Sequence, residues 1–260
     1  MKFSVCIEMI FNELPFYDRF AAVKNAGIDT AEIWGWAHRD VCEMKQAIDY
    51  SGVLLSSMCV DSKDKAVSDR YKKNSIVTDG SEGIFCEIVH HSAEAAKRLG
   101  VKNLIVTTGQ ENENISRERQ QENIISALLA AAPIFEANGL TAVIEPLNTL
   151  IDHKGYYLST SRQAADIITE VSSKNVKMLF DVYHQQITEG NVINNIKKYI
   201  DLIGHFHIAD NPGRHEPGTG ELNYSSIFNA IAKTGYDGYI GLEFSPTIDN
   251  TKALAELQKL

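Results

Sequence analysis

A recurring pattern of glycines constrains the fold of this chain more than any other sequence feature. Four stretches of helical periodicity end at Gly27, Gly100, Gly139 and Gly235, and a short apolar run follows each glycine within a few residues. Glycine adopts the left-handed backbone conformation at the C-terminus of a helix without the steric penalty of a Cβ atom. Each occurrence therefore indicates a helix that ends just before a strand begins, which is typical of βαβ units in a parallel sheet.

Eight strands and eight helices are expected from this alternation. We place the strands at residues 3–9, 30–35, 53–60, 103–108, 141–147, 177–183, 202–209 and 238–244. We place the helices near residues 15–26, 40–51, 83–99, 116–138, 160–171, 192–200, 224–234 and 251–259. Units of roughly 32 residues match the size of a (β/α)₈ TIM barrel. We therefore predict an α/β protein with a single barrel domain over residues 1–260.

An open, doubly wound α/β sheet is the alternative architecture. Such sheets usually carry a glycine-rich phosphate loop after an early strand. The sequence contains neither a G-x-G-x-x-G nor a Walker pattern. The barrel is therefore favoured, and the regular spacing argues against two separate domains.

Residues 61–80 form a long polar connection that does not fit a tight repeat. If the third strand ends near Val60, this segment leaves the C-terminal rim of the barrel, where loops build active sites. It is either a lid over such a site or a solvated connection.

Composition and charge exclude several classes of function. The chain has 25 Lys and Arg against 34 Asp and Glu, a formal net charge of −9, whereas binding of nucleic acid normally needs a basic excess. No apolar run approaches the roughly 18–20 residues of a membrane span. The four cysteines, Cys6, Cys42, Cys59 and Cys86, have no metal-binding or disulfide-framework spacing. We expect a cytoplasmic protein with reduced thiols, and neither nucleic acid nor membrane as a partner.

Polar side chains follow the apolar runs of four successive strands, the fifth to the eighth. They are Glu145, Asp181, His207 and Glu243. Because side chains at the carboxyl ends of barrel strands converge on the mouth, we expect these four to lie together. Carboxylates buried around one space need a compensating cation. Three carboxylate oxygens and one imidazole nitrogen suit one divalent ion, Mn²⁺ or Mg²⁺, with Co²⁺ as a further option.

Two histidines lie in the seventh strand. His205 and His207 are two residues apart, so both side chains point to the same side of the strand. We choose His207 as the metal ligand. His205 is expected one layer deeper, as a core histidine hydrogen-bonded to a carboxylate. The pair His90-His91 falls in a helical stretch, where we expect a surface or packing role.

The second half of the chain resembles a known enzyme family. Five segments carry the resemblance: IEPLN at 144–148, FDVYH at 180–184, GHFHIAD at 204–210, NPGRHEPGTGE at 211–221 and GLEF at 241–244. Together they resemble the hydroxypyruvate isomerase family. That family belongs to the superfamily of xylose-isomerase-like barrels, together with ketose 3-epimerases and the endonuclease-IV-type repair enzymes. The stretch in 211–221 is the most distinctive part.

The resemblance implies a metal-dependent isomerase that interconverts a small hydroxy-keto acid and its aldehyde isomer, of the hydroxypyruvate/tartronate semialdehyde or 2-oxotetronate type. It implies that Glu145, Asp181, His207 and Glu243 hold the metal, and that Glu145 and Glu243 also act as the two acid/base groups. It further implies that His184 hydrogen-bonds a substrate oxygen. Physical chemistry agrees, because such a proton transfer passes through an enediolate that a divalent ion stabilises while two carboxylates move the proton.

Two features bear on the substrate and favour different answers. The resembling isomerases often carry Gln at the position of His207, whereas ketose 3-epimerases carry His there. The epimerases, in turn, carry an acidic residue at the position of Ile151 and lack the long loop around Arg214. The substrate is therefore a small hydroxy-keto acid or a free sugar, and ketose 3-epimerisation is the alternative activity.

Arg214 lies in a glycine- and proline-rich loop just beyond the seventh strand. A guanidinium there would bind a substrate carboxylate in bidentate fashion. The alternative is an ion pair with Glu216 or Glu221 that stiffens the loop. Trp34 and Trp36 close the second strand, where they either wall the pocket or pack as ordinary core residues.

Two other classes of function are compatible with a barrel. A nuclease acting on abasic DNA would need further His and carboxylate ligands for a multi-metal cluster and a basic rim, and the net charge argues against it. A non-catalytic sugar-binding protein would not need two carboxylates placed for proton transfer. Association into a homo-oligomer is compatible with the sequence, which does not determine the number of subunits.

Overall fold

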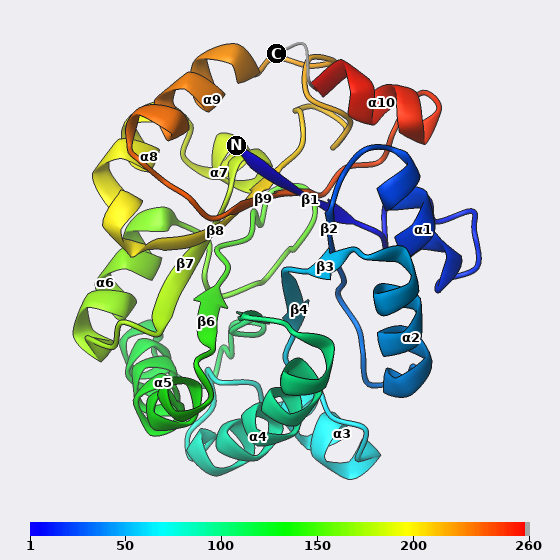
Figure 1. Cartoon of the computed structure of the whole chain (residues 1–260). Helices are drawn as coiled ribbons and strands as arrows, with labels where there is room; N and C mark the ends of the chain where they lie inside the picture. The colour runs from blue at the N-terminus through cyan, green and yellow to red at the C-terminus, as the bar shows by residue number, and fades with distance from the viewer. Residues whose placement is uncertain (258–260) are drawn as a thin grey trace.

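The computed structural model describes residues 1–257, and its strands form one parallel sheet that closes on itself (Figure 1). The order of the strands is β3-β2-β1-β9-β8-β7-β6-β5-β4. Their bounds are β1 (Lys2–Cys6), β2 (Thr30–Glu32), β3 (Leu54–Leu55), β4 (Ser57–Cys59), β5 (Asn103–Val106), β6 (Thr141–Ile144), β7 (Val176–Asp181), β8 (Ile203–Ile208) and β9 (Tyr239–Leu242).

The short strands β3 and β4 at the two ends of this order are parts of one segment. Ser56 lies between them, and its backbone N–H donates to the carbonyl of Ala31 at 2.9 Å while its carbonyl accepts from the N–H of Asn103 at 3.3 Å. The segment therefore joins β2 to β5 and closes the barrel. The predicted (β/α)₈ TIM barrel is confirmed, with the third predicted strand present in two pieces.

Helices surround the strands on the outside (Figure 1). Their bounds are α1 (Asp18–Asn25), α2 (Val41–Ser51), α3 (Lys65–Asn74), α4 (Glu82–Leu99), α5 (Arg117–Asn138), α6 (Ser161–Val171), α7 (Val182–Thr188), α8 (Val192–Tyr199), α9 (Tyr224–Lys233) and α10 (Asn250–Leu257), with a 3₁₀ turn at Ile200–Leu202. All the predicted helices are present; residues 258 and 259 of the last one lie outside the described range. Gly100 and Gly139 end α4 and α5 in the left-handed conformation, as the glycine pattern predicts.

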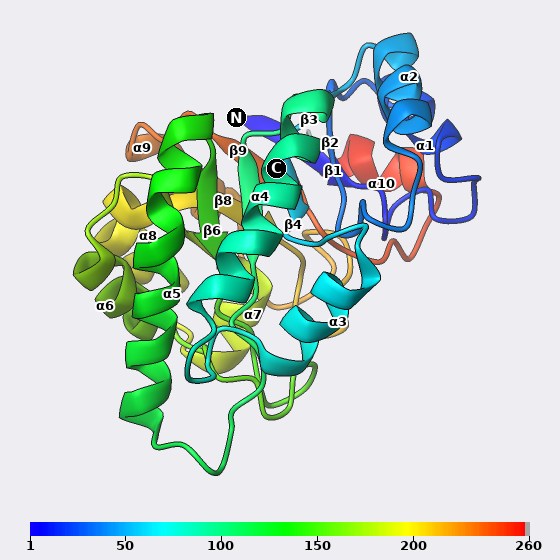
Figure 2. The same ribbon diagram turned by 90° about the horizontal axis from the view of Figure 1, so that it is seen from below.

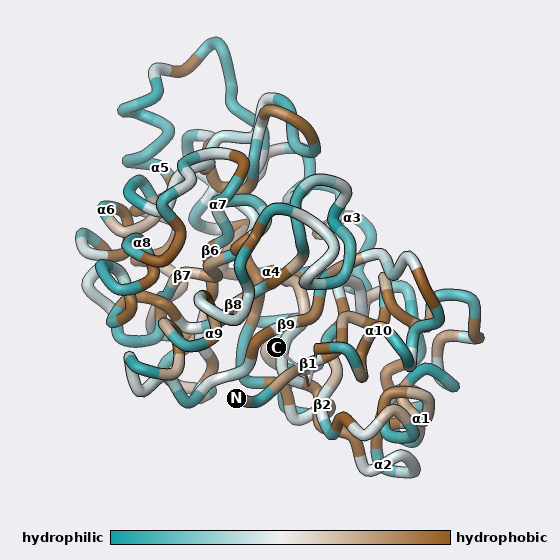
Figure 3. Tube along the Cα trace, turned by 90° about the horizontal axis from the view of Figure 1, so that it is seen from above, coloured by the Kyte–Doolittle hydropathy of each residue, from teal (hydrophilic) through white to brown (hydrophobic). Residues whose placement is uncertain are grey.

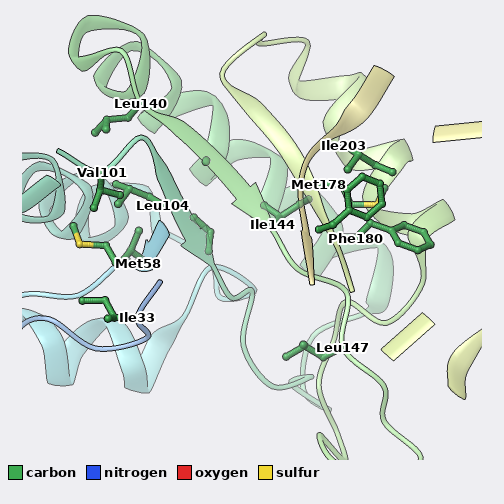
Figure 4. Packing of buried hydrophobic residues seen from close by; sticks show 14 of the residues in the cluster. Ile33, Met58, Val101, Leu104, Leu140, Ile144, Leu147, Met178, Phe180 and Ile203 are labelled. Carbon is green, nitrogen blue, oxygen red and sulfur yellow. The ribbon is translucent and has the colours of Figure 1, made fainter. Parts of the chain in front are cut away.

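Buried apolar side chains form two clusters. The larger one lies between the strands and the helices, and Figure 4 shows Leu104, Ile144 and Met178 within it. The smaller one consists of Ile105, Val143 and Leu179, with Cys59 against it. These residues alternate along their strands with members of the larger cluster, so they point into the barrel. Figure 3 shows the hydropathy along the chain, with hydrophilic residues in many of the outer loops and helices.

Residues 61–80 differ from the predicted polar connection, because they contain helix α3. Asp64 begins this helix by accepting hydrogen bonds from the N–H groups of Ala66 and Val67. Val67 and Tyr71, four residues apart, are buried on one face, and the Tyr71 ring stacks on Phe85 of α4. Two buried side chains at helical spacing outweigh the polar composition of the segment. The lid interpretation stays a prediction.

Strand β7 ends earlier than predicted, since Val182 and Tyr183 already belong to helix α7. The carboxylate of Asp181 accepts hydrogen bonds from the N–H groups of Tyr183 and His184, at 2.7 and 3.2 Å, and so caps the helix. Helices α3 and α7 lie at the end of the barrel away from the N-terminus (Figure 2). The carboxyl ends of the strands face this end.

Two expectations from composition can be compared with the structure. All four cysteines are free thiols, as expected. Within residues 1–257, no helix combines the length and the apolar character needed to cross a membrane.

Candidate active site

The structure brings the four candidate metal ligands together at the carboxyl ends of four strands. Glu145 follows β6, Asp181 ends β7, His207 lies in β8 and Glu243 follows β9. All four are buried, and each offers a ligand atom within 4.8 Å of the others. The register pairs Asp181 with His207 and His207 with Gly241, so neighbouring strands present these side chains at one level. We refer to the four residues as the carboxylate cluster.

The donor set of the carboxylate cluster fits a divalent ion. The Nδ1 atom of His207 lies 3.3 Å from Oε1 of Glu145 and 3.2 Å from Oε2 of Glu243. It makes no hydrogen bond of acceptable geometry with either oxygen. Three carboxylates and one imidazole thus converge with an unpaired nitrogen between them, and such a mostly oxygen set suits Mn²⁺ or Mg²⁺.

Glu32 is a site residue that the sequence analysis missed. Its Oε1 atom lies 3.1 Å from Nε2 of His207, and its Oε2 atom lies 2.9 Å from Nε2 of His205. A carboxylate behind a ligand imidazole fixes the orientation of the ring. The signal was available, because Glu32 interrupts the apolar run of the second strand as Glu145 does in the fifth.

The prediction for His205 is confirmed. Its side chain is buried and hydrogen-bonded to the carboxylate of Glu32. The register pairs His205 with Leu179, two residues before Asp181 on β7, so His205 lies one layer below His207. Space at this level depends on Gly241, where a Cβ atom would stand 2.3 Å from Oε1 of Glu32 and 2.5 Å from Cδ2 of His207.

Burial and charge perturb the ionisation of the buried groups. Burial raises the pKa of Asp181, although Arg214 partly opposes this effect. Burial also acts to raise the pKa values of Glu32 and Glu243, but neighbouring hydrogen-bond donors and positive charges outweigh it. His207 and His205 lower the pKa of Glu32 to about 2, and His207 with Arg214 holds the pKa of Glu243 well below its usual value.

Glu243 receives two further contacts that the sequence analysis did not foresee. The indole Nε1 of Trp34 donates a hydrogen bond to its Oε1 atom at 2.6 Å, and Nη2 of Arg214 contacts its Oε2 atom. Trp34 is 39% exposed, so its ring borders the open side of the cluster, whereas Trp36 is buried in the core. The two tryptophans therefore have different roles, one at the site and one in packing.

Arg214 contacts the cluster rather than its own loop. Its Nη2 atom lies 4.0 Å from Oδ2 of Asp181, and the guanidinium lies over the ring of Tyr183, 5.4 Å from the centroid. Glu216, one of its two expected partners in the loop, instead accepts hydrogen bonds from Thr247. Within residues 1–257, Arg214 pairs with Glu243 and Asp181 and with neither Glu216 nor Glu221, so the alternative of a stiffening ion pair within the loop is wrong.

The remaining candidate histidines lie in different places. His184 is buried in the first turn of α7, with Nε2 3.6 Å from Oδ2 of Asp181, which puts it beside the cluster. His90 is exposed on α4, and Nδ1 of the half-buried His91 lies 2.6 Å from Oγ of Ser62. The surface and packing roles expected for His90 and His91 are confirmed.

Comparison with known proteins places the whole chain in a family. A model described as "Xylose isomerase-like TIM barrel" matches residues 20–260. The chain is 33% identical to 2-oxo-tetronate isomerase of Cupriavidus necator over 257 residues, which cover 99% of this chain and 97% of that protein. It is 31% identical to hydroxypyruvate isomerase of Escherichia coli over 246 residues, covering 95% and 94%.

Solved structures agree with this placement. A protein from Brucella melitensis described as AP endonuclease, family 2 superposes with a TM-score of 0.90 at 28% identity, covering 99% of this chain and 98% of that one. A D-psicose 3-epimerase superposes with a TM-score of 0.80 at 17% identity over 100% and 99% of the chains, a likeness of fold alone. From the family match and the full-length relatives named as isomerases, this chain belongs to the xylose isomerase-like TIM barrel family.

Proposed function

We propose that this protein is a divalent-metal-dependent isomerase that interconverts a small hydroxy-keto acid and its aldehyde isomer, of the hydroxypyruvate or 2-oxotetronate type. The observation that carries the proposal is the convergence of the carboxylate cluster within 4.8 Å, next to the guanidinium of Arg214. The names of the full-length relatives support the same substrate class.

In this proposal Glu145, Asp181, His207 and Glu243 hold one ion, Mn²⁺ or Mg²⁺, and Co²⁺ would also fit. The bound ion would supply positive charge to stabilise the negative charge that develops on two adjacent substrate oxygens. Glu32 holds the ring of His207 in place from behind. Trp34 holds one oxygen of the Glu243 carboxylate and Arg214 holds the other.

Glu145 and Glu243 are the two groups proposed to move the proton. They follow β6 and β9, which lie on either side of β7 and β8 in the barrel. One carboxylate removes the proton from the hydroxyl-bearing carbon, and a proton returns to the former carbonyl carbon of the enediolate. The hydroxyl proton passes to the former carbonyl oxygen, so the hydroxyl and carbonyl groups exchange places. The same pair thus serves both directions of the isomerisation.

Arg214 is proposed to bind the carboxylate of the substrate. A guanidinium has five N–H donors, and Nη2 is the atom that contacts Glu243. The Nε atom has no hydrogen-bond partner within residues 1–257. Donors therefore remain for a second carboxylate, which a planar guanidinium binds in bidentate fashion. His184 is proposed to hydrogen-bond a substrate oxygen.

Proton exchange in D₂O tests this proposal. We would load the protein with Mn²⁺, exchange the ion for Mg²⁺ and follow hydroxypyruvate and 2-oxotetronate by ¹H NMR. We expect deuterium to enter the keto acid as the aldehyde isomer appears, and Glu145→Gln to abolish both. Absence of exchange with both keto acids would contradict the proposal.

Ketose 3-epimerisation is the second candidate, favoured by His207, because ketose 3-epimerases carry histidine at this ligand position. The same experiment with fructose and psicose separates the two activities, because an epimerase would exchange deuterium at C3 of the ketose alone. Arg214→Met adds an independent criterion. If Arg214 binds a substrate carboxylate, Arg214→Met should raise KM for a keto acid by roughly tenfold or more. The KM for a ketose should change less, because a ketose has no carboxylate.

A further inference from the structure

The two ring nitrogens of His184 have different surroundings. Nδ1 faces Asn148, at 2.7 Å from its side-chain Nδ2 and 3.4 Å from its backbone N. Nε2 lies at the carboxylate cluster, 3.6 Å from Oδ2 of Asp181. A neutral imidazole carries its proton on one nitrogen only, so the partner of Nδ1 decides whether Nε2 donates or accepts a hydrogen bond.

The amide of Asn148 has one possible orientation. Its Oδ1 atom accepts hydrogen bonds from the backbone N–H groups of Ile151 and Asp152, at 3.0 and 3.1 Å. Backbone N–H groups only donate, so the atom that faces them is the oxygen. The Nδ2 atom donates to Oδ2 of Asp152 at 2.7 Å and faces Nδ1 of His184. Since Nδ2 has hydrogens and no accepting lone pair, Nδ1 has to accept.

The proton of the His184 ring is therefore on Nε2. The Nε2–H group has no hydrogen-bond partner within residues 1–257, and 3.6 Å to Asp181 is too long for one. A buried donor without a partner is rare in folded proteins. This donor lies beside the carboxylate cluster, so an acceptor atom of a ligand bound there would satisfy it.

We propose that Asn148 is a positioning residue that holds His184 in its Nε2–H form, so that the ring presents a hydrogen-bond donor to the carbonyl oxygen of the substrate. For the identity of the ligand, this inference rests on the proposed function. A carbonyl oxygen and the enolate oxygen derived from it accept hydrogen bonds, so a donor stabilises both. In the other tautomer the lone pair of Nε2 would face the substrate oxygen and the Asp181 carboxylate and would repel both.

Nitrogen NMR reads the tautomer directly and needs no turnover. We would label the Mg²⁺-loaded protein with ¹⁵N-histidine, record long-range ¹H–¹⁵N correlations and assign the His184 signals by their loss in His184→Gln. We expect the wild-type ring to carry its proton on Nε2, with Nδ1 unprotonated. A proton on Nδ1 in the wild-type protein would overturn the inference.

Variants of the Asn148–Asp152 pair test the cause. Asn148→Asp keeps the oxygen for both backbone N–H groups but has no donor, so Nδ1 of His184 should gain the proton. The double variant Asn148→Asp/Asp152→Asn has the same effect without two adjacent carboxylates. Asp152→Asn alone is the matched control, because Asn148 is intact and the Nε2–H form should persist. Retention of that form in the double variant would overturn the role of Asn148. If the Asn148 variants do not fold, the wild-type spectrum still decides the tautomer.

Kinetics distinguish positioning from a general structural role. His184→Gln and the Asn148→Asp/Asp152→Asn variant should each lower kcat for the keto acid by roughly 10²-fold, with a smaller effect on KM. Their combination should cost no more than His184→Gln alone, because Asn148 acts through that ring. If the losses of kcat multiply in the combined variant, Asn148 acts independently of His184, and the inference would be overturned. A wild-type protein inactive on both keto acids would contradict the proposed function and leave the NMR result standing.

Discussion

Glu32 is the single residue on which the geometry of the cluster depends most directly. The carboxylate of Glu32 contacts both His205 and His207, and the Glu32 side chain is buried beneath the four candidate ligands. Ser57 donates a further hydrogen bond to its Oε2 atom at 3.3 Å. Because the imidazole of His207 is held from behind, its Nδ1 atom faces Glu145 and Glu243.

We expect Glu32→Gln to weaken Mn²⁺ binding by about 10- to 100-fold, the usual effect of losing a carboxylate behind a ligand histidine. Isothermal titration calorimetry with Mn²⁺ measures the change, and circular dichroism checks that the variant is folded. Glu8→Gln is the matched control, because that carboxylate pairs with Arg39 instead of a cluster histidine. An unchanged dissociation constant in Glu32→Gln would contradict the role given to Glu32.

Gly241→Ala tests the space beside Glu32 and His207. The added Cβ atom would stand 2.3 Å from Oε1 of Glu32 and 2.5 Å from Cδ2 of His207, so both side chains would have to shift. We expect a loss of about 1–3 kcal/mol in the free energy of unfolding, together with weaker Mn²⁺ binding. Gly83→Ala on α4 is the control, because a Cβ atom there meets nothing within 4 Å and alanine favours a helix by about 0.5–1 kcal/mol. Equal stability of the two variants would refute this packing argument.

At the scale of elements, the segment that carries Arg214 is held at two points. Asp210, just after β8, accepts hydrogen bonds from the backbone N–H groups of Gly218 and Leu222 at 2.8 and 3.1 Å. Glu216 accepts from the backbone N–H and the hydroxyl of Thr247, at 2.9 and 2.5 Å. The Asp210 bonds hold the segment after β8 together, and the Glu216–Thr247 bonds tie it to the segment after β9, so Arg214 is held beside Glu243.

The Glu216–Thr247 contact gives a pH-dependent contribution to stability. Burial acts to raise the pKa of Glu216, but the hydrogen bonds from Thr247 outweigh it and hold the pKa below the usual 4.5. A lowered folded-state pKa means that the contribution is present above pH 4.5 and is lost as the pH falls through the folded-state value. We expect Glu216→Gln to cost about 1–2 kcal/mol at pH 7.

Urea denaturation at pH 7 and at acidic pH measures this effect. The stability difference between Glu216→Gln and wild type should shrink as the carboxylate of the wild-type protein becomes protonated. Glu221→Gln, an exposed carboxylate in the same segment, should change stability by about 0.5 kcal/mol or less. If the stability difference between Glu216→Gln and wild type stays constant with pH, the ionised carboxylate of Glu216 is not its origin.

The elements also show where sequence reasoning falls short. The sequence alone indicates that Asp181 belongs to a strand, but Asp181 is also the N-cap residue of α7. Apolar Val182 and Tyr183 therefore look like a continued strand when only the local pattern is considered. In residues 61–80 the polar composition concealed α3, whose stability depends on the contact of Tyr71 with Phe85 of α4.

For the whole molecule, the barrel brings three buried carboxylates close together, and a bound cation should stabilise the fold. At a free concentration of 100 times the dissociation constant, a ligand specific to the native state adds about 2.7 kcal/mol. For a chain of this size we therefore expect Mn²⁺ to raise Tm by roughly 5–10 °C. Thermal unfolding with and without Mn²⁺, after treatment with a chelator, measures the shift.

Asp181→Asn is the matched control for the metal effect. Asparagine can still cap α7, since its side-chain oxygen accepts the same backbone hydrogen bonds, but it does not offer a charged ligand. We expect this variant to lose most of the Mn²⁺-dependent rise in Tm. An equal rise in the variant would place the ion away from the carboxylate cluster.

The sequence by itself determined the alternation of strands and helices, because this depends on periodicity. It also placed four candidate ligands at the same end of the barrel, because parallel strands have their carboxyl ends on one side; these are Glu145, Asp181, His207 and Glu243. Tertiary structure alone decided which distant groups meet across the barrel. Glu32 reaches His205 from 173 residues away, and Trp34 reaches Glu243 from 209 residues away. Such contacts depend on how the closed sheet staggers its strands, and no local pattern encodes that arrangement.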